Sequence, residues 1–159
     1  MKKEAIQAYT ARIAQANKSE LTVILYEMIQ TELRDAKDAY DQSDLDTFAK
    51  SLKRAQKYVN ELISTLDFKY AISYDLLSLY LYINKRIITA IIKQNPISLD
   101  SAESVLNKLY TGFSGISSQD TSGPVMRNTQ QVYAGLTYGK GTLNETYIDP
   151  NQQNRGFIA

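Results

Sequence analysis

Residues 73–94 read SYDLLSLYLYINKRIITAIIKQ, and their apolar side chains recur with the period of a long α-helix. With about 100° between successive residues, one apolar stripe is made by Leu76, Tyr80, Ile83, Ile87, Ala90 and Ile91. A second apolar stripe, displaced by about a third of a turn, is made by Tyr74, Leu77, Leu81, Ile88 and Ile92. The first stripe predicts a face that packs into a helical core, and the second needs its own explanation.

The second stripe has two explanations, because periodicity indicates burial without naming the burying neighbour. The helix can lie centrally and pack against more neighbours than the other helices do. Alternatively, the stripe lines an exposed groove for an amphipathic helix of a partner protein. The chain has twelve tyrosines and no tryptophan, and Tyr74, Tyr80 and Tyr82 cluster on this helix. Tyrosine suits a surface that is partly wet and partly apolar, which favours the partner slightly.

Helix-start signals predict two long helices before this stretch. Asn17 followed by Glu20 is similar to a capping box and predicts a helix over residues 18–40. A polar turn follows, in which Ser43 or Asp44 is the expected cap of the next helix. Both helices carry an apolar face at helical spacing.

Pro96, two residues after the quoted stretch, is expected to close its helix, and a shorter helix is predicted after it. Ser98 or Asp100 is its expected cap, and it should end near Gly115. Short connections between four such helices predict an all-α fold, an antiparallel up-down four-helix bundle. A short amphipathic segment precedes the bundle.

The glycines divide the chain in two. All seven lie at or beyond Gly112, and a glycine inside a helix costs about 1 kcal/mol relative to alanine. Residues 1–116 are therefore predicted to be the four-helix bundle domain. Residues 117–159, rich in Gly, Asn and Gln, are predicted to be a polar, flexible tail.

Composition excludes several function classes. The chain has no cysteine and no histidine, which removes thiol chemistry, the commonest general base and the commonest metal ligand. We therefore expect no enzyme activity, no metal, no cofactor and no small-molecule substrate. The net charge of +1 argues against a nucleic-acid partner. No run is long and apolar enough for membrane insertion, and no secretory signal is recognisable, so we expect a cytoplasmic protein.

Three stretches, in the same order along the chain, resemble the flagellar secretion chaperone family, FliS. The first is residues 17–28, NKSELTVILYEM, preceded by Ala8-Tyr9. The second is residues 61–67, ELISTLD, and the third is residues 76–83, LLSLYLYI. The resemblance covers roughly residues 6–113 and departs from the family pattern at Met28, where the family usually has glycine.

The resemblance implies a cytoplasmic export chaperone that binds the C-terminal helical segment of flagellin. Such a chaperone keeps that segment from polymerising and delivers it to the flagellar export gate, without catalysis. Ile6 and Tyr9 match the N-terminal segment that, in the family, covers the empty groove or contacts the export gate. A hydrophobic clasp that closes the bundle is the alternative role for both residues.

The remaining candidate binding residues come from the two longest helices. Tyr26 matches the family's Leu-Tyr element and is expected to point away from the core stripe, toward a partner. Tyr82 matches a family tyrosine and is expected to flank the binding surface. Geometry selects the others, which form the second stripe of the quoted helix: Tyr74, Leu77, Leu81, Ile88 and Ile92. In the tail, Tyr133, Leu136 and Tyr138 are hypothesised to occupy the groove when flagellin is absent.

Two other classes of function remain open. A regulatory adaptor would use the same bundle to bind a signalling or RNA-regulatory protein. A structural bundle would associate with copies of itself through the second stripe. The identity of the protein that co-purifies with the chain distinguishes a chaperone from an adaptor, and light scattering would detect self-association.

Overall fold

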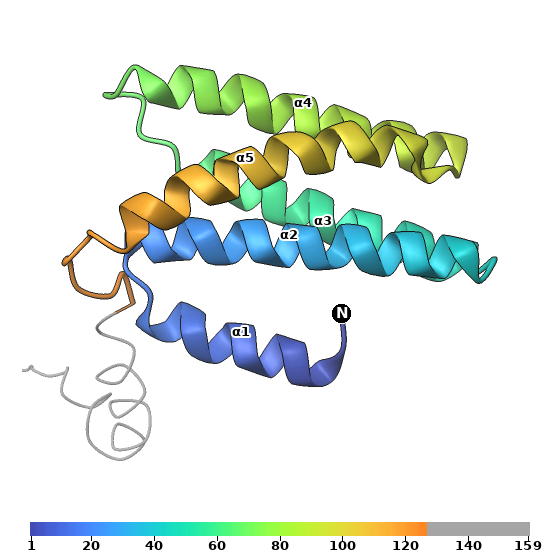
Figure 1. Cartoon of the computed structure of the whole chain (residues 1–159), viewed down its shortest axis with the longest axis horizontal. Coiled ribbons are helices and arrows are strands. Elements are labelled where there is room, and N and C mark those ends of the chain that lie inside the picture. The colour runs from blue at the N-terminus through green and yellow to red at the C-terminus, as the bar shows by residue number, and fades with distance from the viewer. Residues whose placement is uncertain (127–159) are drawn as a thin grey trace, which may run out of the picture.

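The structure is a computed structural model that describes residues 1–126. Residues 127–159 are drawn in grey in Figure 1, so the hypothesis about Tyr133, Leu136 and Tyr138 lies outside the described residues, as does most of the predicted tail. The described part is helical and contains no strand. Its elements are α1 (Lys3–Gln15), α2 (Lys18–Asp41), α3 (Leu45–Ser64), α4 (Ile72–Lys93), the 3-10 helix η1 (Pro96–Ser98) and α5 (Leu99–Ser117). The all-α prediction is confirmed.

The predicted starts of α2 and α3 are confirmed by their caps. The Asn17 side-chain oxygen accepts a hydrogen bond from the backbone N–H of Glu20 at 2.8 Å, and α2 begins at Lys18. Of the two candidates for the next cap, Asp44 is the one used, because its carboxylate accepts from the N–H of Thr47 at 2.9 Å. Ser43 instead has a positive φ of 61°, which reverses the chain between the two helices.

The start of α5 differs from the prediction. Asn95, and not Ser98 or Asp100, provides the side-chain cap, since its oxygen accepts from the N–H of Ile97 at the start of η1. The chain is already helical at Ser98, whose hydroxyl donates to the carbonyl of Arg86 at 2.8 Å. The chain therefore enters α5 through the 3-10 turn η1, and α5 itself has no side-chain cap.

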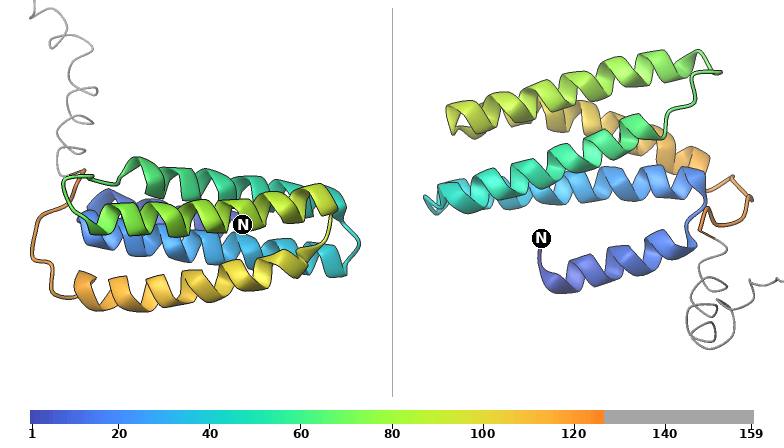
Figure 2. Two further views of the ribbon diagram at one scale, coloured as in Figure 1. Left: turned by 90° about the horizontal axis from the view of Figure 1, so that it is seen from above. Right: turned by 180° about the vertical axis from the view of Figure 1, so that it is seen from behind.

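Helices α2, α3, α4 and α5 enclose one core, and each packs against two of the others. Helix α2 contacts α3 and α5, and α4 contacts the same two helices from the other side (Figure 2). The largest fully buried apolar side chains come from all four helices: Tyr26, Ile29, Leu33, Phe48, Leu52, Leu62, Tyr80, Ile83, Ile87, Leu99 and Leu106. Tyr80, Ile83 and Ile87 of the α4 stripe predicted to face the core belong to this set, and the rest of the stripe is buried or packs against the core.

Helix α1 lies outside this core. It runs back along α2, on the side of the molecule opposite α4 (Figures 1 and 2). None of its residues is fully buried, although Tyr9 and Ile13 pack against the edge of the core. Helix α1 is thus a peripheral element that covers one face of α2.

Among residues 1–126, no helix is both long enough and apolar enough to span a bilayer.

Candidate functional site

The second stripe of α4 is exposed along most of its length. Tyr74 is 60% exposed, Leu81 52%, Ile88 38% and Ile92 75%, whereas Leu77 is partly buried. We call these five residues the α4 band. Of the two explanations for the band, central packing fails within the described residues, because no described element covers it. An apolar surface of this kind on a folded protein is typical of a contact site for another protein.

Tyr82 does not belong to the band. It is 41% exposed, but one residue step turns the helix by about 100°, so Tyr82 projects from a different side of α4 than Leu81 does. The structure therefore places Tyr82 beside the band and not within it.

The exposed apolar surface continues beyond the N-terminal end of α4. Phe68 is 44% exposed, Tyr70 63% and Ile72 60%, and the ring of Phe68 lies 5.1 Å from that of Tyr74 at the start of the band. Tyr70 and Ile72 also line a small cavity of about 220 Å³ near the start of α2. Sequence reasoning missed Phe68 and Tyr70 because they lie in a connection, where helical periodicity gives no signal. It missed Ile72 because α4 begins at this residue, one position before the predicted start.

The expectation for Tyr26 is wrong. Its side chain has no solvent exposure, and its hydroxyl lies 2.7 Å from that of Tyr80, with which it shares a hydrogen bond. Burial raises the pKa of both tyrosines above the ordinary value of 10, so both hydroxyls stay neutral. The ring of Phe113 packs edge-on against Tyr26. Tyr26 points into the core because α5 covers the side of α2 from which it projects.

Polar side chains attach α1 to its neighbours at two points in its second half. The Tyr9 hydroxyl lies 3.3 Å from that of Thr31 on α2. Arg12 forms an ion pair with Glu27 of α2, and the Tyr110 hydroxyl of α5 donates to the same carboxylate at 3.1 Å. Hydrogen bonding to Glu27 is the main cause that raises the pKa of Arg12. Glu27 therefore connects three helices.

Ile6 and Tyr9, predicted together as N-terminal contact residues, differ in environment. Tyr9 is partly buried against the core, which agrees with a clasp. Ile6 is 49% exposed and is not among the residues packed against the core. Neither residue lies near the α4 band, since α1 and α4 are on opposite sides of the molecule.

A buried carboxylate was missed by sequence reasoning. Glu32 of α2 has no solvent exposure, and Arg54 of α3 donates to both of its oxygens, one of them at 3.0 Å. This hydrogen bonding is the main cause that raises the pKa of Arg54. The α-amino group of Met1 lies 3.5 Å from Glu32 and 2.7 Å from Asp35. A signal was present, because Glu32 follows Met28 and Ile29 at helical spacing and so falls on the core side of α2.

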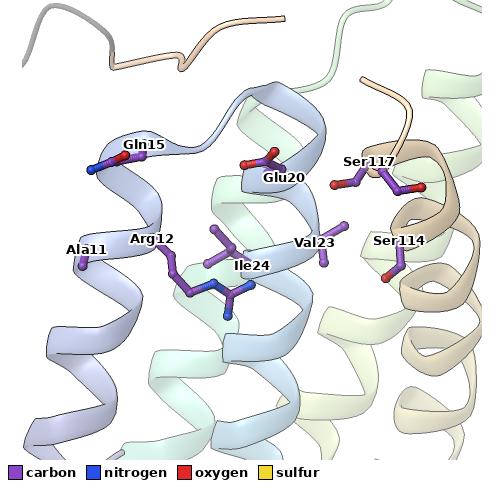
Figure 3. Close-up of a pocket in the computed structure, with 9 residues that line it drawn as sticks. Ala11, Arg12, Gln15, Glu20, Val23, Ile24, Ser114 and Ser117 are labelled. Carbon is purple, nitrogen blue, oxygen red and sulfur yellow. The ribbon is translucent and has the colours of Figure 1, made fainter. Parts of the chain in front are cut away.

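A groove separates α1 from α5 across the face of α2 (Figure 3). It has a volume of about 610 Å³, and Val23 and Ile24 form its apolar floor. Arg12 lies on the α1 side, and Ser114 and Ser117 lie on the α5 side. No sequence pattern predicted this groove, because it depends on where α1 packs.

Within the described residues, no three potential metal-ligating side chains come together. The candidate site is thus the α4 band, a surface suited to contacts with protein, together with the face of α2 that α1 covers.

A family model described as "Flagellar protein FliS" matches residues 1–120, which include the five α-helices found within residues 1–126. The chain belongs to the FliS family. FliS proteins are flagellar export chaperones, so the chain has a chaperone role in flagellum assembly and acts with flagellar proteins. FliS is also not an enzyme family. The comparison with curated proteins gives no match.

Proposed function

We propose that this FliS chain binds the C-terminal helical segment of flagellin in the cytoplasm, prevents its premature polymerisation and delivers it to the flagellar export apparatus. The observation that carries the proposal is the α4 band, which is exposed in a family whose members act as export chaperones. Helices α2–α5, taken as an antiparallel up-down bundle, would provide the rigid support for this surface.

The dimensions of the band suit an amphipathic helix. From Tyr74 to Ile92 the band spans about 27 Å along α4, which equals about five turns of a partner helix. Its side chains recur at helical spacing, the arrangement that accepts the apolar face of another helix. A flagellin terminus has such a face, and covering it would block the contacts by which subunits assemble.

We further propose that the two candidate regions have different roles. The α4 band is the docking surface for flagellin. Helix α1 is a cover over the face of α2, the second part of the candidate site, and none of its residues is fully buried. Ile6, the exposed apolar side chain of α1, is the residue available to contact the export gate.

Calorimetric titration with a peptide of the flagellin C-terminal helical segment tests the docking surface. We expect a 1:1 complex with the wild-type chain, and binding weaker by about tenfold or more in Leu81→Glu, because a carboxylate would be buried against apolar surface. Tyr82→Glu, beside the band, should weaken binding less. Asn60→Glu is the matched control, since it adds the same charge at an exposed position of α3.

Circular dichroism of each variant establishes that the fold is retained, which is expected because Leu81 is half exposed. Absence of binding by the wild-type chain, or equal binding by Leu81→Glu and Asn60→Glu, would contradict the proposal.

A further inference from the structure

After α5, the chain turns back and contacts the connection between α1 and α2. Residues 118–126, which we call the strap, leave the end of α5 and reach Ala16 (Figure 1). There the backbone N–H of Val125 donates to the carbonyl of Ala16 at 2.9 Å. The strap therefore joins the last helix of the described chain to the end of the first.

Asp120 provides the other attachment of the strap. Its carboxylate accepts a hydrogen bond from the Ser19 hydroxyl at 2.6 Å, and its backbone carbonyl accepts from the Asn17 side-chain amide at 3.2 Å. The carboxylate also accepts from the N–H and hydroxyl of Ser122, which shapes the strap itself. These hydrogen bonds hold the pKa of Asp120 at about 2, so it accepts them as an anion at neutral pH.

These contacts converge on a short hinge. Only Ala16 and Asn17 separate α1 from α2, and both have extended backbone conformations. Ala16 is 1% exposed and Asn17 4%, an unusual degree of burial for a two-residue connection. A segment that packed at random would contact whichever surface lay nearest. The strap instead places its hydrogen bonds on the hinge residues and on Ser19, in the first turn beyond them.

The hinge matters because α1 is weakly held elsewhere. Helix α1 has no fully buried residue. Tyr9 and Ile13 pack only partly against the core, and Arg12 pairs with Glu27. Just before the helix, the Met1 α-amino group forms ion pairs with α2. With so little apolar burial, the free energy that keeps α1 in place depends strongly on a few hydrogen bonds and ion pairs. Fixing the hinge limits the directions in which α1 can move.

We propose that the strap pins the α1–α2 hinge and thereby controls how readily α1 detaches from α2. Release of the strap would free α1 and uncover the face of α2 that includes the floor of the groove at Val23 and Ile24. The consequence for flagellin binding rests on the proposed function, in which α1 is a cover. The pinning of α1 does not, so the two can be tested separately.

Hydrogen exchange of the full-length chain tests the pinning. Asp120→Ala removes the carboxylate, and Val125→Pro removes the N–H that reaches Ala16. In the double variant we expect amide exchange in α1 to be about tenfold faster, with exchange in α3 and α4 unchanged. Thr121→Ala and Val125→Ala are the matched controls, because they keep both attachments. Unchanged exchange in α1 of the double variant would overturn the proposal.

Titration of the same variants with the flagellin peptide tests the link to function. If the flagellin segment contacts the face of α2 under α1 in addition to the α4 band, the double variant should bind several-fold more tightly than the wild-type chain, because less free energy is spent on detaching α1. Faster α1 exchange with unchanged affinity would contradict the role of α1 as a cover. If the wild-type chain fails to bind the peptide, the proposed function is overturned. The exchange result then tests only whether the strap pins the α1–α2 hinge.

Discussion

Tyr26 and Tyr80 place two hydroxyls 2.7 Å apart in the core, where neither side chain has significant solvent exposure. A buried hydroxyl without a partner costs more free energy than the shared hydrogen bond contributes. Each tyrosine therefore depends on the other, and this pair helps to fix how α2 and α4 face each other.

We expect Tyr26→Phe to lower the free energy of unfolding by about 1–2 kcal/mol, because it leaves the Tyr80 hydroxyl unpaired. The double variant Tyr26→Phe/Tyr80→Phe should lose less than the sum of the two single variants, since it leaves no orphaned hydroxyl. Urea unfolding of the four proteins followed by circular dichroism measures both values. Strict additivity would show that the two hydroxyls are energetically independent.

At the scale of the elements, α2 is the helix that neighbours surround. It packs against α1, α3 and α5, and residues 23–26 are all buried, so its N-terminal half is covered on several sides. The apolar pattern of α4 is broader than that of α2, yet α4 keeps one apolar side exposed. The amount of apolar surface on a helix is therefore a poor guide to its place in this fold.

Helix boundaries were largely predictable from the sequence, whereas helix neighbours were not. The cap at Asn17 is a local interaction among residues three apart, so it can be read from sequence. The burial of Tyr26 depends on Phe113 of α5, which is 87 positions away, and no local pattern encodes that contact. The same reason explains why the α4 band was predicted but its exposure was not.

Helix α5 contains two glycines, and neither a close contact nor a positive φ requires glycine at these positions. A Cβ added at Gly112 or Gly115 would meet no atom within 4 Å apart from the adjacent residues and the backbone of the same helix, and neither residue has a positive φ. Alanine lowers the entropy of the unfolded chain and favours the helix. We expect Gly112→Ala to stabilise the protein by about 1 kcal/mol and Gly115→Ala, in the last turn, by less. Thermal unfolding measures the gain, and destabilisation by either change would contradict this account of α5.

At the scale of the whole molecule, two buried or partly buried carboxylates hold separate helices together. Glu27 contacts α1 and α5 from α2. Glu32 contacts α3 through Arg54 and lies near the start of the chain at Met1. These charged contacts add to the apolar packing of α2 against α3 and α5, and they tie α1, which shares little apolar surface with α2, to the same helix.

We expect Arg54→Met to lower the free energy of unfolding by about 3 kcal/mol, because it leaves the fully buried Glu32 without its main partner. The variant Glu32→Met/Arg54→Met should be more stable than Arg54→Met, since it removes the unpaired charge. Lys53→Met, an exposed neighbour on α3, is the control and should change stability little. Denaturant unfolding of the three variants would contradict this account if the double variant were the least stable.

The strap has a consequence for the order of events during synthesis. Asn17 and Asp120 are 103 positions apart, and closing so long a loop has an entropic cost that local helix formation lacks. Helix α1 leaves the ribosome first, and the residues that pin its hinge leave after all five α-helices have been made. Every newly made chain therefore passes through a stage in which its body can fold while α1 is still unpinned.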